Sequence, residues 1–179
     1  MKRTALWIVG APAVGKTTLA RALLGPRPYT LIGPPKWTCA GRTIAAGHYE
    51  GKTFDGADSV PYNGVLPALY YWQVTFAPVV TLTIFDGDRF SYTKAVEFVR
   101  AHVDRVACVY VAAPSCAELE RRRAERNWNP DPRWLKGRDT KAKRFAISFT
   151  DCLCVADDAL ERTRAFIEQR PYIEPRIDL

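Results

Sequence analysis

The chain has 179 residues, a length typical of one compact domain that buries a core without disulfide or metal crosslinks. Hydrophobic residues make up 47% and charged residues 25%, which is ordinary for a soluble globular protein, and apolar runs such as 106–113 are too short to cross a bilayer. The net charge of +7 favours a polyanionic partner or a phosphorylated substrate. We therefore expect a single domain over 1–179 that binds no membrane.

Five cysteines, an odd number, fit a reducing compartment better than a disulfide framework. The apolar run at 5–9 is too short for a signal peptide, and Gly-Lys-Thr follows it instead of a cleavage site. We expect a cytoplasmic protein whose oligomeric state the sequence leaves open.

The first apolar segment, 5–9, predicts a buried parallel strand, and residues 16–24 predict a helix that ends at Gly25-Pro26. Between them, Gly-Ala-Pro-Ala-Val-Gly-Lys-Thr at 10–17 matches the Walker A pattern in the strand–loop–helix context that this motif requires. Backbone amides of such a loop surround phosphates at the positive end of the helix dipole. The residues expected to bind ATP are Gly10, Ala11, Pro12, Ala13, Val14, Gly15, Lys16, Thr17 and Thr18.

Two side chains of this motif have specific expected roles. Lys16 is expected to reach the β- and γ-phosphates and so to take part in catalysis, and Thr17 is expected to ligate Mg²⁺.

A second strand is predicted at 29–32, and a long segment without a clear period follows at 36–64. A connection of this length in a small domain is usually functional. Its aromatic, basic and acidic residues suit a flat polar ligand, with rings to stack and charges for phosphate or for base edges. We expect this segment to bind the substrate. The expected contacts from it are Arg42, Tyr49, Asp55 and Asp58.

A helix is predicted at 64–76, and a strand at 79–85 ends in Asp86-Gly87-Asp88-Arg89. An acidic residue at this strand end should face the Mg²⁺ site, because strand ends converge on the phosphate loop. Asp86 is therefore expected to bind the metal or to act as the base, with Asp88 as the competing candidate. Arg89 is expected to contact the substrate.

Further helices are predicted at 91–103, 115–126 and 139–149, with a strand at 105–113 and a loop at 127–138. Ten basic residues lie between Arg121 and Arg144, against three acidic ones. We interpret residues 115–144 as a lid that closes over ATP and excludes water. Arg122, Arg126 and Arg138 are the candidates to stabilise the transferring phosphoryl group.

The last elements are a short strand at 152–156 and an amphipathic helix at 158–169. The pattern as a whole predicts an α/β fold of the P-loop NTPase type, with three α/β/α layers. Its sheet is expected to hold five parallel strands in the order 2-3-1-4-5.

The phosphate loop, substrate segment, acidic strand end and arginine lid together resemble the small P-loop nucleoside and nucleotide kinases. Within that group the chain is most similar to bacteriophage kinases that act on 5-hydroxymethyluracil in DNA. The segments that carry this narrower resemblance are 6–18, 41–42, 49–51, 54–58, 85–89 and 134–141. The resemblance implies ATP and Mg²⁺ as cofactors, DNA as the substrate and, for a phage protein, the host cytoplasm as the location.

Three hypotheses about function follow. The first is a kinase that phosphorylates a base-attached hydroxymethyl group in DNA. The second is a kinase for a free nucleoside, a nucleoside monophosphate or another small metabolite, and the third is a nucleotide-binding module without catalytic activity.

Overall fold

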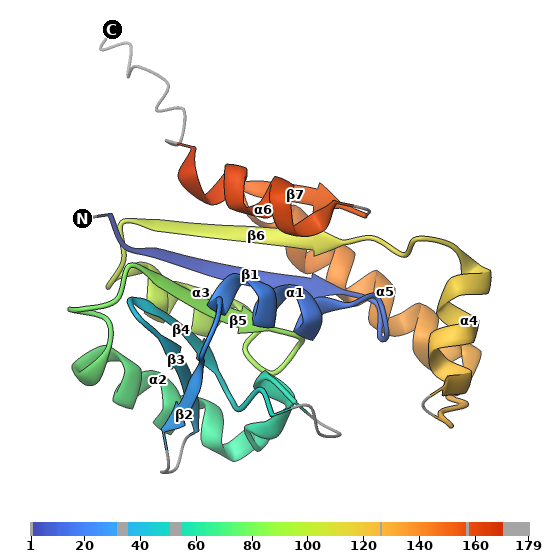
Figure 1. Ribbon diagram of the computed structural model, residues 1–179, viewed down its shortest axis with the longest axis horizontal. Helices are drawn as coiled ribbons and strands as arrows, with labels where there is room; N and C mark the ends of the chain where they lie inside the picture. Colours follow the sequence, from blue (N-terminus) through green and yellow to red (C-terminus); the bar gives the residue numbers. More distant parts are fainter. Residues whose placement is uncertain (1, 32–35, 51–54, 126, 157, 170–179) are drawn as a thin grey trace, which may run out of the picture.

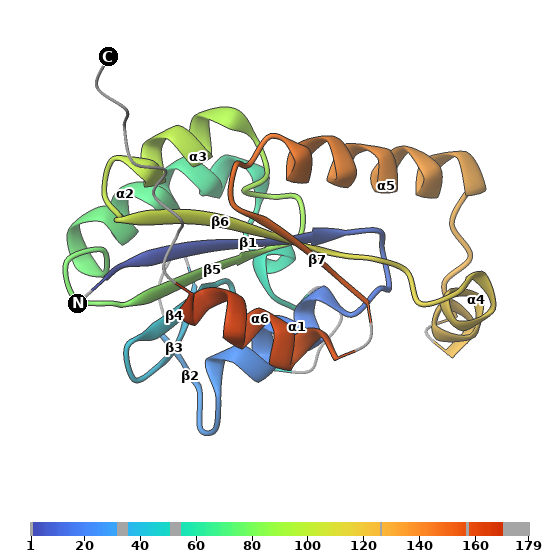
Figure 2. The same ribbon diagram turned by 90° about the horizontal axis from the view of Figure 1, so that it is seen from above.

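A computed structural model describes residues 2–31, 36–50, 55–125, 127–156 and 158–169. A single twisted sheet runs through this part of the chain, with helices packed on both of its faces (Figure 1). Figure 2 shows α2, α3 and α5 on one face and α1 and α6 on the other. None of the described helices is both long and apolar enough to cross a membrane.

The described strands are β1 (Thr4–Gly10), β2 (Tyr29–Leu31), β3 (Trp37–Ala40), β4 (Thr43–Ala46), β5 (Leu82–Asp86), β6 (Arg105–Val111) and β7 (Cys152–Val155). The described α-helices are α1 (Lys16–Leu24), α2 (Val65–Thr75), α3 (Thr93–Arg100), α4 (Cys116–Glu125), α5 (Pro132–Ile147) and α6 (Ala159–Glu168). Two short 3₁₀ helices, η1 (Ala57–Ser59) and η2 (Tyr62–Gly64), lie between β4 and α2.

The predicted five-stranded, wholly parallel sheet is wrong. The described sheet has seven strands in the order β2-β3-β4-β5-β1-β6-β7, and it is mixed. β2 and β3 pair antiparallel, as do β3 and β4, whereas the pairs β4–β5, β5–β1, β1–β6 and β6–β7 are parallel. The strand predicted at 29–32 therefore lies at an antiparallel edge, and β4 from the supposedly irregular segment lies beside β5.

The physical reason is a tight turn at Gly41-Arg42 that sequence periodicity did not reveal. Gly41 adopts φ +58°, a left-handed conformation typical of hairpin turns. The strands on either side of it are only four residues long, too short for a clear alternation of apolar and polar residues.

The core lies on both faces of the sheet, and β1 supplies alternate residues to each. Ala5, Trp7 and Val9 pack under α2, α3 and α5, while Leu6 and Ile8 pack toward α1 and α6. A strand buried on both faces belongs in the centre of a sheet. The central position of β1 fixes the loop that follows it at the carboxyl edge.

The predicted loop at 127–138 is also wrong in its second half, because α5 begins at Pro132. The side chain of Asp131 accepts hydrogen bonds from the backbone N–H groups of Arg133 and Trp134, which caps the helix. Proline at the first helical position is compatible with this start, because its missing N–H has no partner there in any helix.

Candidate active site at the phosphate loop

The loop between β1 and α1 packs closely against the end of β6. A Cβ atom on Gly10 would lie 2.4 Å from the carbonyl oxygen of Val111, so only glycine fits at this point. Ala13 adopts φ +72°, a conformation that costs a non-glycine residue about 1–2 kcal/mol. Such strain is often found where a loop holds a ligand. The loop ends at Gly15, directly before the first turn of α1.

Lys16 lies over its own loop. Its Nζ donates hydrogen bonds to the carbonyl oxygens of Gly10, at 3.1 Å, and Ala11, at 2.8 Å. The ammonium group is thus held above the loop, beside the N-terminus of α1, where the expected phosphates would lie.

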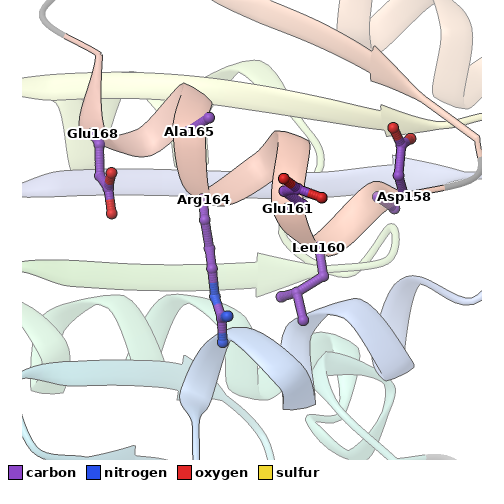
Figure 3. Close-up of a pocket in the computed structure, with 7 residues that line it drawn as sticks. Asp158, Leu160, Glu161, Arg164, Ala165 and Glu168 are labelled. Carbon is purple, nitrogen blue, oxygen red and sulfur yellow. The ribbon is translucent and has the colours of Figure 1, made fainter.

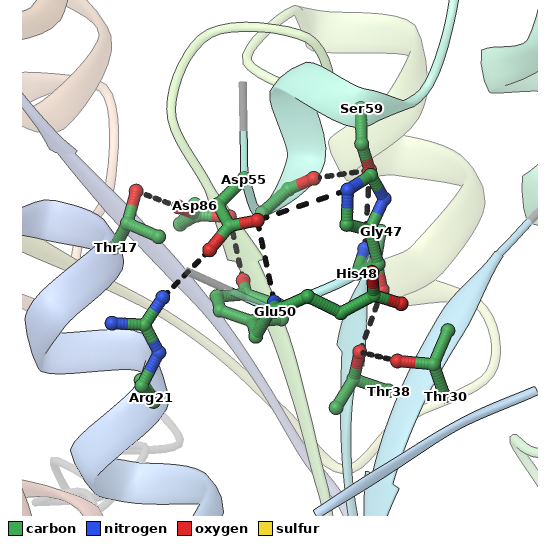
Figure 4. A network of polar contacts seen from close by, with 12 residues as sticks. Thr17, Arg21, Thr30, Thr38, Gly47, His48, Glu50, Asp55, Ser59 and Asp86 are labelled. Atoms are coloured by element: carbon green, nitrogen blue, oxygen red, sulfur yellow. Dashed lines mark hydrogen bonds and ion pairs between the residues drawn. The ribbon is translucent and has the colours of Figure 1, made fainter. Parts of the chain in front are cut away.

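The hydroxyl of Thr17 joins α1 to the end of β5. Its Oγ1 donates to Oδ2 of Asp86 at 2.9 Å (Figure 4). The other carboxylate oxygen, Oδ1, accepts from the hydroxyl of Tyr49 at 2.6 Å and from the backbone N–H of Ala57 at 2.8 Å. Both oxygens of Asp86 are therefore bound by donors from three different segments.

Asp86 is almost fully buried, at 3% exposure. Burial raises the pKa of its carboxyl group, while the hydrogen bonds from Tyr49, Ala57 and Thr17 and the charge of Lys16 act in the opposite direction. Gly56 lies against this carboxylate, and a Cβ atom there would come within 2.5 Å of Oδ2. The segment around Gly56 thus closes over Asp86 and leaves no room for a side chain.

Asp58, in η1, is the carboxylate that remains partly open, with its side chain 49% exposed. Burial raises its pKa, and the nearby charges of Asp86 and Asp88 raise it further, while Lys16 and Arg89 lower it. The carboxylates of 58, 86 and 88 therefore lie close enough to repel one another. Asp58 is the exposed member of a group gathered around the end of β5.

Two arginines and a lysine pair with members of this group. Nε of Arg89 lies 3.6 Å from Asp58, and its guanidinium stacks on the ring of Tyr62 at 3.8 Å from the ring centre. Arg138 of α5 forms an ion pair with Asp88, and Lys141 Nζ lies 3.6 Å from the same carboxylate. α5 is thus tied to the strand end that bears the acidic residues.

Arg122 brings α4 against the phosphate loop. Its Nη1 donates to the carbonyl oxygens of Ala13, at 3.4 Å, and Val14, at 3.3 Å, while Nε pairs with Glu118 at 2.6 Å. Arg122 is therefore the lid arginine that reaches the loop in the described part of the chain. Arg126, the other candidate on this helix, lies outside the described residues.

The structure places the predicted substrate contacts at different ends of β5. Arg42 is far from the loop, since its carbonyl oxygen accepts from Thr81 and Leu82 at the amino end of β5, opposite Asp86. Tyr49 is buried, and its hydroxyl donates a hydrogen bond to Asp86. Burial and the charge of Asp86 raise the pKa of the Tyr49 hydroxyl well above its usual value, so it remains a donor.

Asp55 is also engaged by its neighbours. It pairs with Arg21 of α1 at 2.6 Å and lies 3.7 Å from Nε2 of His48 (Figure 4). This contact ties the segment after β4 to the helix that follows the phosphate loop. The roles of Arg21 and Tyr62 in these contacts were missed, because neither residue belongs to a motif.

The oxygen atoms beside the loop fit a magnesium ion. Mg²⁺ in phosphate sites is bound through one or two carboxylates and hydroxyls together with substrate phosphates. Thr17 and Asp86 supply such a pair, with their oxygen atoms 2.9 Å apart. The described residues hold no cluster of three acidic, histidine or cysteine side chains that could bind a metal without phosphate. The oxygen atoms of Thr17 and Asp86 could hold a metal ion that is also bound by phosphate oxygens.

A separate hollow of about 680 Å³ lies along α6 (Figure 3). Figure 2 shows α6 on the opposite face of the sheet from α5. Three carboxylates and one guanidinium line it, and such a lining repels phosphate groups. These side chains are Asp158, Glu161, Glu168 and Arg164. This hollow is therefore not a candidate for the expected phosphates.

A scan against protein-family models and a search of curated proteins each found no match to this chain.

Proposed function

We propose that this protein is an ATP-dependent phosphotransferase that transfers the γ-phosphoryl group to a hydroxyl of its substrate. The observation that carries the proposal is the hydrogen bond between Thr17 and Asp86, which joins the Walker A helix to the acidic end of β5. A Walker A loop alone supports nucleotide binding. A loop that also has Asp58, Arg89 and Arg122 around it supports phosphoryl transfer.

The residues around the loop would bind and orient the nucleotide. The loop amides and Lys16 would hold the phosphates. Thr17 and Asp86 would hold Mg²⁺, and a bound Mg²⁺ would supply positive charge beside the phosphates. Arg122 already touches the loop carbonyls and is positioned to stabilise the transferring group. Tyr49 and Ala57 keep Asp86 oriented toward Thr17.

We assign the general base to Asp58 and not to Asp86. Both oxygens of Asp86 are hydrogen-bonded and buried, and Asp88 is paired with Arg138 and Lys141. Asp58 is half-exposed, and its raised pKa brings it closer to that of an effective base at neutral pH. The acceptor oxygen forms its bond to phosphorus as the bridge to the β-phosphate breaks, its proton passes to Asp58, and ADP is released.

For the acceptor we propose the 5-hydroxymethyl group of 5-hydroxymethyluracil in DNA. The resemblance of segments 41–42, 49–51, 54–58, 85–89 and 134–141 to phage DNA-base kinases supports this choice, and the net charge of +7 suits a polyanionic substrate.

The test is to incubate the protein with [γ-³²P]ATP and either hydroxymethyluracil-containing DNA or a panel of nucleosides, nucleotides and other small hydroxyl compounds. We expect label on the DNA. Lys16→Ala should abolish transfer, and Lys2→Ala is the matched control, because Lys2 is exposed at the amino end of β1.

Label only on small molecules would refute DNA as the acceptor and leave the proposed phosphotransferase activity in place. ATP binding without transfer to any acceptor would leave a nucleotide-binding module. Absence of ATP binding, or full activity of Lys16→Ala, would overturn the proposal as a whole.

A further inference from the structure

One face of α5 carries a row of four cations, with a glycine and a threonine between them. Residues of this row recur at intervals of three and four along the helix, so they lie on one side of it. They line a hollow of about 510 Å³ and are Arg133, Lys136, Gly137, Thr140, Lys141 and Arg144. We call this set the α5 stripe. Figure 2 shows α5 extending past the carboxyl end of β1 toward α4.

The charges of the α5 stripe are largely uncompensated. Arg133, Lys136 and Arg144 are exposed and make no ion pair with any residue that the structure describes. The two acidic residues of this region are used elsewhere: Asp131 caps the helix, and Asp139 binds Lys143 and Tyr110. A row of unpaired cations on a fixed helix favours an anionic ligand with several charges.

The lining of the hollow indicates what kind of anion fits. It consists of arginine, lysine, glycine and threonine, without an apolar or aromatic side chain. A protein partner usually needs apolar or aromatic anchors at the centre of an interface, whereas a phosphate backbone needs cations and hydroxyl donors. Gly137 leaves open space above the helix, since a Cβ atom there would meet nothing within 4 Å. A backbone of phosphates and sugars could therefore approach the helix closely.

The α5 stripe also has a length that suits a nucleic acid. The twelve residues from 133 to 144 are separated by eleven steps of 1.5 Å, so the stripe is about 16 Å long. This distance corresponds to about five phosphates along one strand of a duplex, at 3.4 Å per step. Lys141 connects the stripe to the proposed active site, because it lines the hollow and its Nζ lies 3.6 Å from Asp88.

We propose that the α5 stripe binds the phosphodiester backbone of DNA next to the base that is phosphorylated. This inference rests on the proposed function for the choice of DNA. The cations of the stripe position the strand, while Asp58 in η1 acts on the hydroxyl group. Arg133, Lys136 and Arg144 are thus binding residues that do not touch the reacting atoms.

The test compares two triple variants that remove the same amount of charge. One is Arg133→Gln/Lys136→Gln/Arg144→Gln in the stripe. The other, as a control, is Lys2→Gln/Arg100→Gln/Arg162→Gln at exposed positions on other parts of the surface. Binding to a fluorescent hydroxymethyluracil-containing oligonucleotide is measured by anisotropy from 50 to 300 mM NaCl, in single-stranded and duplex forms. ATP affinity and thermal unfolding show that both variants are folded.

We expect the stripe variant to lose on the order of 100-fold in DNA affinity at about 0.1 M salt, with a salt slope that is smaller by about 2–3. The control variant should lose much less, and ATP affinity should change by less than about twofold in both. With DNA as acceptor, the stripe variant should show a raised KM and a nearly unchanged kcat.

Equal losses in the two variants would overturn the inference, because net charge alone would then explain binding. Tighter binding of RNA, or of vesicles rich in phosphatidylserine, than of DNA would also overturn it. If phosphoryl transfer to DNA occurs and the stripe variant binds DNA as tightly as the native chain, the DNA-binding role of the α5 stripe is refuted and the proposed function stands. Stripe-dependent DNA binding without any transfer would refute the proposed function and keep the stripe.

Discussion

Replacing Tyr49 with phenylalanine tests whether this residue supports Asp86 or binds substrate. The change keeps the ring in its buried position and removes only the hydroxyl that donates to Asp86 Oδ1 at 2.6 Å. A hydrogen bond to a charged group contributes about 1.5–3 kcal/mol. For a protein of this size, such a loss lowers Tm by roughly 3–12 °C. A residue that only contacted substrate would change KM and leave stability intact.

The effect of Tyr49→Phe should depend on pH. Burial already raises the pKa of Asp86 in the folded chain, and the Tyr49 hydroxyl opposes this rise by stabilising the ionised form. Without the hydroxyl the pKa rises further. A group whose pKa is raised by folding destabilises the fold above that pKa, and this cost disappears as the pH falls and the carboxyl group takes up its proton. The loss should therefore be largest at neutral pH and smaller in acid.

The assay is urea unfolding followed by tryptophan fluorescence at pH 7.5 and pH 5, with Tyr29→Phe as the control. Tyr29 is 58% exposed on the edge strand β2, so its hydroxyl should contribute little. A loss for Tyr49→Phe below about 0.5 kcal/mol at pH 7.5, or a larger loss at pH 5 than at pH 7.5, would refute this account of Asp86.

Three further variants test other contacts. Gly56→Ala should lower the free energy of unfolding by about 2–5 kcal/mol, because the φ of +73° and the 2.5 Å approach to Asp86 both oppose a side chain. Urea unfolding measures this loss, and Gly41→Ala is the control because a Cβ atom there meets nothing within 4 Å. An equal loss in the two variants would contradict the prediction. Arg105→Met should lower the free energy of unfolding by about 3–5 kcal/mol, because the buried guanidinium pairs with Asp151 at 2.5 Å and donates to carbonyls at the end of α6. A Tm within about 2 °C of that of the native chain would contradict this prediction. Asp58→Asn should lower kcat by about 10²–10⁴ and remove the acidic limb of the pH profile, which should lie above the ordinary aspartate pKa of 3.8. A raised pKa destabilises the fold above that pKa, so the Tm of Asp58→Asn at pH 7.5 should be no lower than that of the native chain. An unchanged pH profile would show that Asp58 is not the base.

The local features of the phosphate loop could be predicted from sequence alone. The Walker A residues are contiguous, and the strand before them and the helix after them are each defined by their own composition. The helix predicted at 16–24 is confirmed without a shift, and the strand predicted at 5–9 lies within β1. The position of Asp86 at the end of β5 follows in the same way, because an apolar run ends there. The start of α5 at Pro132 carried a capping signal in Asp131-Pro132 that the prediction of a loop overlooked.

The contacts around Asp86 were decided by tertiary structure. Two four-residue strands between 37 and 46 add an antiparallel edge and bring β4 beside β5. This pairing brings Tyr49 and Ala57 to Asp86. It leaves Arg42 at the amino end of β5, away from Asp86. Strand order depends on which surfaces bury one another, and the spacing of residues along one segment does not encode that choice. Sequence thus determined the loop that we propose to hold phosphate. The packing of distant segments determined that Asp86 is buried and that Asp58 is left exposed.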